Sequence, residues 1–311
     1  MERTAILCDL LGVRYPLMQG GMAHISDARL AAAVSNGGGL GIISAASGNP
    51  EQVAAQIDEA RALTDKPFGV NIMLRGNNID EIAKLVAEKK VAVVTTGAGS
   101  PAAYIPMWRE AGVKVIPVIS TAAMAQLMEK SGADAVVAEG TESGGHVGEM
   151  TTMALVPQVC DAVQIPVIAA GGIADGRGVA AAFMLGACGV QIGTRFLAAE
   201  ECSVHPEYKA RLLKAKDTST IVTGKRLGHP VRSLKTAFSR GYAKVEYTDI
   251  SDEELEAMAV GTLRAAVVDG DPKRGCFLAG QISGMVNQEQ PAAEMIAEIM
   301  EQAGQLLGWQ F

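Results

Sequence analysis

The sequence has few aromatic residues, few cysteines and no long hydrophobic run. Aromatic residues make up 4% of the 311 residues, and every apolar run is interrupted before the ~18 residues that a membrane-spanning helix needs. The first residues lack the pattern of a signal peptide. The five cysteines are scattered without a CxxC pair, which argues against a disulfide framework or a thiolate metal site. We therefore expect a cytoplasmic protein with reduced cysteines and no membrane association.

Acidic residues outnumber basic residues over the whole sequence, but not in every segment. A net charge of −7 disfavours nucleic acid as a partner. Residues 205–244 are an exception, because they hold two acidic residues, Glu207 and Asp217, against ten basic ones: Lys209, Arg211, Lys214, Lys216, Lys225, Arg226, Arg232, Lys235, Arg240 and Lys244. This basic segment is either a solvated surface or a docking patch for an acidic partner or a phosphorylated substrate.

Small aliphatic residues are abundant and recur in a β/α pattern. Short β-branched segments alternate with Ala-rich stretches of helical spacing, which favours an α/β protein. Eight such strands are expected at residues 16–19, 40–43, 69–73, 91–95, 113–118, 135–139, 166–169 and 189–193. A doubly wound open sheet would concentrate its glycine motif after the first strand, whereas here glycines follow several strands. The pattern therefore predicts a (β/α)8 TIM barrel.

Helix boundaries and a long C-terminal region complete the predicted architecture. Asp27, Thr121 and Asp175 are suited to cap helices that begin directly after them. Residues 1–311 are expected to form a single domain, with residues 197–250 as a basic, irregular extension and residues 251–311 as a C-terminal helical segment. Within that segment, helices are expected at residues 251–268 and 291–307. We expect the C-terminal extension to pack near the barrel mouth.

A phosphate site is expected at the ends of the last two strands. Gly171 and Gly172 follow strand seven, and Gln191, Gly193 and Thr194 end strand eight. In (β/α)8 barrels these two strand ends commonly bind phosphate through backbone N–H groups and a helix N-terminus. The alternative is a pair of tight turns without a ligand.

The ends of strands one and three carry residues suited to a flat ring system with a polar edge. Gly21 lets the backbone approach one edge, Met22 can pack on a face, and the Asn71 amide can both donate and accept hydrogen bonds. Taken singly, Gly-Gly is usually a turn and Met is usually core filling. Together with the phosphate site, these residues indicate a flavin site that binds FMN.

The loop after strand six carries a histidine that we expect on the catalytic face. It begins near Glu139 and contains Gly144, Gly145 and His146. Consecutive glycines allow a mobile loop or a close approach of the backbone, and His146 can exchange a proton or hydrogen-bond a substrate carbonyl. The alternative is a histidine satisfied by a neighbouring backbone group.

The other histidines have no assigned chemistry. His205 and His229 each precede a proline in turn contexts that favour structural roles, and the sequence identifies no partner for His24. The carboxylates and histidines lack the spacing of a metal site, so no metal centre is expected.

The motifs, in their order, resemble those of the flavin-dependent enoyl-acyl-carrier-protein reductases of bacterial fatty-acid synthesis. The resemblance runs nearly end to end through QGGM (19–22), GGLGII (38–43), DKPFGVNIML (65–74), TTGAG (95–99), GADAVVAEG (132–140), ESGGHVG (142–148), PVIAAGGIADGRG (166–178), QIGTRF (191–196), GHPVR (228–232) and GQISGM (280–285). Nitronate monooxygenases belong to the same superfamily and share the fold, the FMN and the Gly-Gly-His loop. Glu139 and His229 favour the reductase, because many monooxygenases carry Gln and Arg at these positions.

The resemblance assigns roles by position. It implies that the isoalloxazine of FMN contacts Gly21, Met22 and Asn71, with Glu139, Gly144 and Gly145 near it. It implies that the ribityl-phosphate end is bound by Gly172, Gln191, Gly193 and Thr194, next to Gly171. His146 would lie beside the substrate.

The implied reaction is the final step of the fatty-acid elongation cycle, in which NADH or NADPH reduces a trans-2-enoyl-acyl-carrier protein through FMN. The implied partner is an acidic acyl-carrier protein; a homodimer is expected, and a monovalent cation is a further candidate cofactor. Three alternatives stay open: a nitronate monooxygenase that oxidises nitroalkanes with FMN and O2, a flavin-free sugar-phosphate barrel enzyme, and a non-catalytic FMN carrier.

Overall fold

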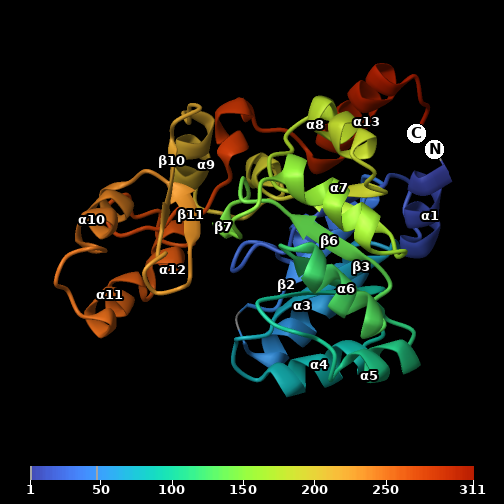
Figure 1. Cartoon of the computed structure of the whole chain (residues 1–311), viewed down its shortest axis with the longest axis horizontal. Helices are drawn as coiled ribbons and strands as arrows, with labels where there is room; N and C mark the ends of the chain where they lie inside the picture. Colours follow the sequence, from blue (N-terminus) through green and yellow to red (C-terminus); the bar gives the residue numbers. More distant parts are fainter. Residues whose placement is uncertain (1, 47) are drawn as a thin grey trace.

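The computed structural model describes residues 2–46 and 48–311, and a parallel eight-stranded barrel forms its centre (Figure 1). The strands are β1 (Leu17–Gln19), β2 (Gly41–Ser44), β3 (Phe68–Met73), β4 (Val93–Gly97), β5 (Lys114–Ile119), β6 (Val136–Glu139), β8 (Val167–Ala170) and β9 (Gly189–Ile192). They pair in the order β1-β9-β8-β6-β5-β4-β3-β2. A parallel bridge from Met18 to Leu40 joins the two end strands. This confirms the predicted (β/α)8 TIM barrel.

The inside of the barrel is an apolar core that α1 (Glu2–Leu11) covers at one end. The inward side chains include Ile42, Val93, Val137 and Ile168, which are fully buried, as expected for strands enclosed on both faces. Leu7 of α1 belongs to the same cluster. A Cβ added to Gly189, at the start of β9, would lie 2.2 Å from Leu7 Cδ2. The helix therefore closes the N-terminal end of the barrel and leaves the opposite end for a site.

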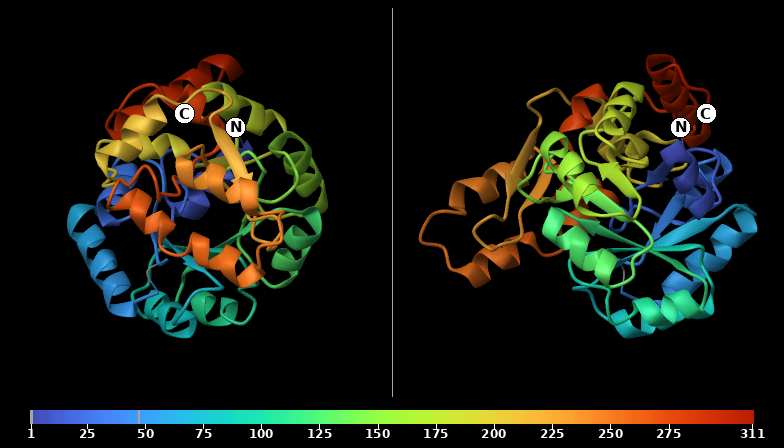
Figure 2. Two further views of the ribbon diagram at one scale, coloured as in Figure 1. Left: turned by 90° about the vertical axis from the view of Figure 1, so that its left-hand side faces the viewer. Right: turned by 45° about the vertical axis from the view of Figure 1, so that its right-hand side comes forward.

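Among the described residues, a helix follows each of seven barrel strands: α2 (Ala28–Asn36), α3 (Pro50–Leu63), α4 (Ile79–Glu88), α5 (Ile105–Glu110), α6 (Ala122–Lys130), α7 (Thr152–Ala162) and α8 (Gly176–Met184). These helices surround the barrel (Figure 2). The three predicted N-caps are confirmed. Asp27 accepts from Leu30 N at 2.9 Å, Thr121 accepts from Met124 N at 3.2 Å, and Asp175 accepts from Arg177 N at 3.0 Å. These bonds satisfy backbone donors that the first helical turn leaves free.

The eighth position of the helical ring is filled from the far end of the chain. Directly after β9, before the chain leaves the barrel, comes the short 3-10 helix η1 (Thr194–Ala198) in place of an α-helix. The vacant position is taken by α13 (Ala292–Leu307), which packs between α8 and α2. A Cβ added to Gly176 would lie 2.4 Å from Ala303 N, and one added to Gly37 would lie 2.9 Å from Ala293 Cα. Glycine at these two positions lets α13 approach closely, so the C-terminal helix is part of the barrel wall.

Residues 199–290, which we call the cap, lie at the C-terminal end of the barrel strands and project from it (Figures 1 and 2). The cap contains α9 (Pro206–Leu213), β10 (Thr220–Thr223), β11 (Val231–Leu234), α10 (Ala237–Val245), α11 (Asp252–Ala259), α12 (Thr262–Val267) and the 3-10 helix η2 (Gln281–Met285). The expectation of an irregular segment at residues 197–250 was therefore wrong. The single helix expected at residues 251–268 is two helices, because Gly261 adopts a left-handed φ of 74° between them.

Within the described part of the chain, no helix is both long enough and apolar enough to cross a membrane.

Candidate active site

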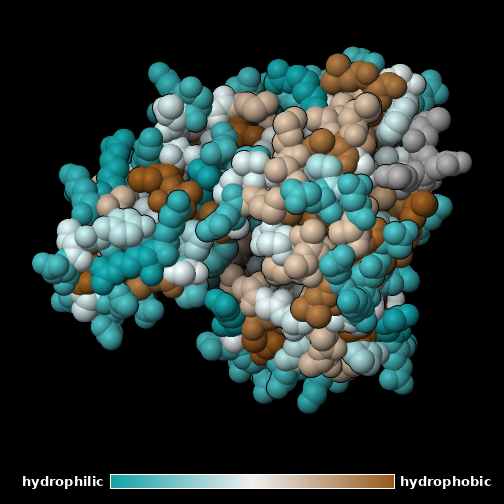
Figure 3. All heavy atoms as spheres, in the orientation of Figure 1, coloured by the Kyte–Doolittle hydropathy of each residue, from teal (hydrophilic) through white to brown (hydrophobic). Residues whose placement is uncertain are grey.

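A cavity of about 440 Å³ lies between the C-terminal ends of the barrel strands and the cap. Figure 3 shows the recess between the two parts on one face of the molecule. All twelve residues that the sequence singled out line this cavity: Gly21, Met22, Asn71, Glu139, Gly144, Gly145, His146, Gly171, Gly172, Gln191, Gly193 and Thr194. The fold thus brings the predicted residues together, while their individual roles stay predictions.

The backbone after β8 and β9 has the geometry of a phosphate cradle. Gly171 and Gly172 have φ values of 89° and 75°, a left-handed conformation that side chains disfavour. A Cβ at Gly171 would also lie 2.7 Å from Gly140 O. Successive glycines of this kind let backbone N–H groups converge on an anion, and η1 begins at Thr194 directly after Gly193. The cradle fits the phosphate of FMN.

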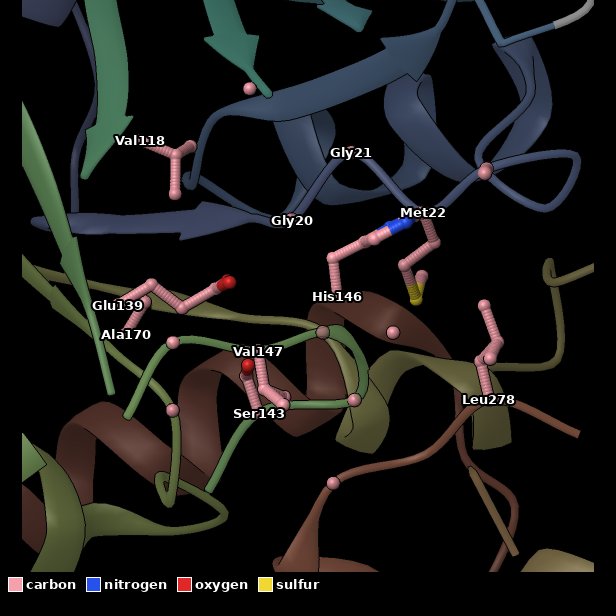
Figure 4. A pocket seen from close by; sticks show the side chains of 18 of the residues that line it. Gly20, Gly21, Met22, Val118, Glu139, Ser143, His146, Val147, Ala170 and Leu278 are labelled. Carbon is pink, nitrogen blue, oxygen red and sulfur yellow. The ribbon is translucent and has the colours of Figure 1, made fainter. Parts of the chain in front are cut away.

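The neighbouring wall of the cavity is the backbone after β1, which lies against Asn71. A Cβ added to Gly21 would lie only 2.3 Å from Asn71 Cβ. The Asn71 Oδ1 accepts from Thr95 Oγ1 at 2.9 Å, which fixes the orientation of the amide. Met22 directs its sulfur into the cavity (Figure 4). A glycine edge, an oriented amide and a polarizable side chain together fit a flavin ring.

The loop with His146 is anchored to the cap. It ends in the two-residue strand β7 (Gly145–His146), which pairs antiparallel with β11 so that His146 lies opposite Val231. The buried Arg232 donates to Thr141 O at 3.0 and 3.2 Å. Gly144 is required in this position, because a Cβ there would lie 2.7 Å from Ala279 C. The backbone of His146 is therefore fixed, and its side chain enters the cavity (Figure 4).

Two titratable groups in the cavity have shifted acidities. Burial raises the pKa of Glu139 to about 7, against a smaller opposite effect of the Ser143 hydroxyl. Burial lowers the pKa of His146, and the neighbouring His229 and Arg75 lower it further. At neutral pH the imidazole is therefore neutral and Glu139 is partly protonated. Such a pair of groups can donate hydrogen bonds or exchange protons near pH 7.

Three titratable side chains line the cavity that the sequence did not assign to it: Arg75, Glu142 and His229. Both carboxylate oxygens of Glu142 accept from Thr152 N at 3.0 Å, so this side chain holds the start of α7. Arg75 Nη1 lies 3.4 Å from His229 Nδ1. His205, by contrast, accepts from Glu207 N at 3.1 Å as a helix cap. Both histidines precede proline, so no local signal distinguishes them.

No group of three or more His, Cys, Asp or Glu side chains that could hold a metal ion occurs among residues 2–46 and 48–311.

Comparison with known proteins agrees with this geometry. The family model for nitronate monooxygenase matches residues 4–87 and 75–302. The (3aS,4S,5R,7aS)-5-hydroxy-7a-methyl-1-oxo-octahydro-1H-indene-4-carboxyl-CoA dehydrogenase of Mycobacterium tuberculosis is 36% identical, with 96% of each chain covered. The probable nitronate monooxygenase of Staphylococcus aureus (strain MSSA476) is 33% identical over 97% of this chain and 98% of its own length.

Two solved structures share the whole architecture. FabK from Thermotoga maritima is 49% identical, with a TM-score of 0.94 and 97% of each chain covered. A nitroalkane oxidase from Streptomyces ansochromogenes is 29% identical, with a TM-score of 0.88, and the match covers 97% of this chain and 99% of that one. The barrel, the cavity and these relatives define an oxidoreductase. The chain belongs to the nitronate monooxygenase family.

Proposed function

We propose that the protein is an FMN-dependent enoyl-acyl-carrier-protein reductase that uses NADH or NADPH. The observation that carries the proposal is that a glycine phosphate cradle, the Gly21–Asn71 wall and His146 line one and the same cavity. The 49% identity to FabK over 97% of the chain supports the reductase, as do the motifs noted above. The proposed reaction completes a cycle of fatty-acid elongation.

When bound, FMN would supply the redox chemistry, which is hydride transfer from the nicotinamide to the β-carbon of the enoyl thioester. Gly171, Gly172 and Gly193 would bind its phosphate through backbone N–H groups. Gly21 and Asn71 would hold the ring edge, and Met22 would pack against a face. These residues orient the reaction partners, which is the main catalytic task when the cofactor supplies the redox chemistry.

His146 and Glu139 have separate tasks in this proposal. The neutral imidazole of His146 would donate a hydrogen bond to the thioester carbonyl, which stabilises the negative charge that develops there as hydride reaches the β-carbon. A proton then adds to the α-carbon to complete the saturated product. Glu139 lies deeper in the cavity, and its raised pKa lets the protonated carboxyl donate a hydrogen bond to the cofactor.

The acyl-carrier protein would dock on a basic groove of about 460 Å³ in the cap. Its walls carry four basic side chains, Arg211, Lys214, Lys235 and Arg240, and one acidic one, Glu207. An acidic carrier is complementary to this charge.

The structure gives other basic residues of the same segment internal roles. Arg226 donates to Glu246 O at 3.1 Å, to Thr248 O at 3.1 Å and to Ile250 O at 2.8 Å. Lys209 is buried and donates to Ala199 O at 2.7 Å. These two side chains hold the cap together, so the proposed docking surface does not include them.

An anaerobic assay with NADH, NADPH and crotonyl thioester tests the reaction. The proposal expects nicotinamide oxidation that depends on the thioester. A yellow protein that ignores the thioester and instead consumes O2 with a nitroalkane is a nitronate monooxygenase, an alternative supported by the family match and by the neutral His146 as a candidate base. A colourless protein without flavin absorption would overturn both.

A further inference from the structure

The mouth of the cavity carries a pair of basic side chains that the proposed chemistry has not used. Arg75 follows β3 on the barrel, and His229 lies in the turn between β10 and β11 on the cap. The two are 154 positions apart in sequence, yet Arg75 Nη1 lies 3.4 Å from His229 Nδ1. Both side chains are exposed and both line the cavity. They therefore meet where the cavity opens to solvent.

The turn that presents His229 is rigid. It is bounded by Gly224 and Gly228, whose φ values of 82° and 73° are left-handed, and His229 N donates to Gly224 O at 3.0 Å. Arg226, in the middle of the turn, forms an ion pair with Asp252 at 2.8 Å and donates to the backbone carbonyls described above. The position of His229 is thus set by the cap rather than by its contact with Arg75.

The hydrogen-bonding capacity of the pair is directed outward. A guanidinium can only donate, so His229 Nδ1 accepts from Arg75 and the ring proton resides on Nε2. The remaining N–H groups of Arg75 and the Nε2–H of His229 are donors for a third group. A phosphate beside them would accept from both, and planar guanidinium donors suit phosphate oxygens particularly well.

The charge at the mouth favours an anion. Arg75 forms no ion pair among the described residues. The two carboxylates that line the cavity are Glu139, at the end of β6, and Glu142, on the loop after it; Glu142 is engaged by Thr152. The guanidinium of Arg75 also lies near His146. The positive charge at the opening is therefore that of Arg75, and no carboxylate of the described residues forms an ion pair with it.

We infer that Arg75 and His229 form a binding site for a phosphate group of the substrates at the cavity mouth. The inference rests on the proposed function for the identity of those substrates. A nicotinamide nucleotide and a phosphopantetheine thioester each carry a phosphate at a distance from the reacting carbon. A mouth site would anchor that phosphate and leave the reacting end free to reach the flavin site.

Two half-reactions of the holoenzyme, measured anaerobically by flavin absorbance, test the site with substrate pairs that differ by one phosphate. Reduction is compared between reduced nicotinamide mononucleotide and reduced nicotinamide riboside. Reoxidation is compared between crotonyl-phosphopantetheine and crotonyl-pantetheine. In at least one pair, we expect the half-reaction to saturate at about tenfold lower concentration of the phosphorylated substrate. The unphosphorylated substrate of that pair cannot form the charge-assisted hydrogen bonds to the phosphate. The pair that differs identifies the source of the phosphate.

Arg75→Gln should abolish that difference, because any effect of the lost charge on His146 applies equally to both members of a pair. Arg264→Gln is the matched control, because Arg264 is an exposed cap residue outside the cavity and its loss removes the same charge. Equal behaviour within both pairs in the wild type, or a difference that survives Arg75→Gln, would overturn the site. If neither thioester reoxidises the flavin, the proposed function fails, while the nicotinamide pair still tests the phosphate site.

A measurement independent of turnover is available because the chain has four histidines. Titration of histidine-labelled holoenzyme with inorganic pyrophosphate should shift the imidazole signals of His229 in nuclear magnetic resonance spectra. His229→Asn assigns the signals, and Arg75→Gln should weaken the binding about tenfold. Shifts confined to His24 or His205 would contradict the assignment of the site.

Discussion

His146 lies directly opposite Val231, where β7 of the barrel loop pairs with β11 of the cap. The next residue, Val147, donates its backbone N–H to Pro230 O at 3.0 Å. The loop therefore leaves the barrel after β6 and ends as an edge strand of the cap sheet. Because backbone contacts hold it at both ends, the His146 side chain can be removed without loss of the loop.

We expect His146→Ala to retain flavin and lose enoyl reduction. The loss of kcat should be at least about 100-fold, as is usual when a positioned acid-base or hydrogen-bonding group is removed. Flavin absorbance of the purified variant checks binding, and the anaerobic thioester assay checks turnover. His24→Asn, at another exposed histidine, is the control and should behave as wild type. Full turnover by His146→Ala would remove this residue from the mechanism.

The position of the same loop depends on Arg232. Its guanidinium is buried and donates twice to Thr141 O, so Arg232→Met would leave that carbonyl without its partner. We expect the free energy of unfolding to fall by about 1–3 kcal/mol and flavin affinity to fall with it. Chemical denaturation and flavin titration measure the two effects. Arg29→Met, at an exposed position of α2, should change neither.

Local patterns in the sequence were sufficient to predict the barrel and the residues around its mouth. Strands enclosed on both faces give short aliphatic runs, and helix caps such as Asp27 are set by neighbours a few positions away. The origin of the eighth helix could not be read locally, because α13 follows β9 only after the whole cap. Residues 251–268 also fitted a continuous helical pattern. The left-handed φ of Gly261 nevertheless divides this segment into α11 and α12.

Sequence reasoning missed cavity residues such as His229, because their place in the cavity depends on contacts between segments that are distant in the sequence. His205 and His229 have the same local context, a histidine before proline, and only the tertiary structure makes one a helix cap and the other a cavity residue. Arg226 and Lys214 are likewise equivalent as charges in the basic segment. The fold gives Arg226 three backbone carbonyls and leaves Lys214 exposed on the groove.

The raised pKa of Glu139 predicts a dependence of stability on pH. The folded-state pKa of about 7 exceeds the ordinary glutamate value of 4.5, so the folded state binds this proton more tightly than the unfolded state. The associated stability is complete below pH 4.5 and is lost as the pH rises through 7. Relative to Glu139→Gln, the wild type should lose at most about 3.5 kcal/mol across this range, since one pKa unit corresponds to about 1.4 kcal/mol.

Denaturation of both proteins without flavin, at intervals between pH 5 and pH 8, measures this difference without a contribution from cofactor binding. A constant difference between wild type and Glu139→Gln would show that the carboxyl titrates normally.

The close contact between Gly21 and Asn71 predicts that one methyl group added at Gly21 has a strong effect on flavin binding. In Gly21→Ala the new Cβ would lie 2.3 Å from Asn71 Cβ, so the backbone or the amide must move. We expect flavin affinity to fall at least about tenfold, because small displacements of positioning groups have large effects. Gly241→Ala in α10 is the control, since nothing lies within 4 Å of its added Cβ, and alanine should be neutral or stabilising there.

The basic groove predicts that carrier-linked and free substrates respond differently to charge. Lys214 and Arg240 are exposed residues of the groove, so Lys214→Glu/Arg240→Glu changes the surface while the contacts of Arg226 and Lys209 stay intact. The KM for crotonyl-acyl-carrier protein should rise about tenfold or more at low salt, and high salt should reduce the difference. The KM for crotonyl-pantetheine should stay constant.

Lys84→Glu/Lys130→Glu makes the same change of charge on helices α4 and α6 of the barrel wall, outside the groove. If docking depended only on the net charge of the protein, both double variants would raise the KM for the carrier-linked substrate equally. A rise confined to the groove variant locates the contact, because long-range repulsion is similar in the two proteins and only the local complementarity differs. If the groove variant changed the KM for the carrier-linked substrate and the KM for crotonyl-pantetheine by the same factor, this surface would be excluded.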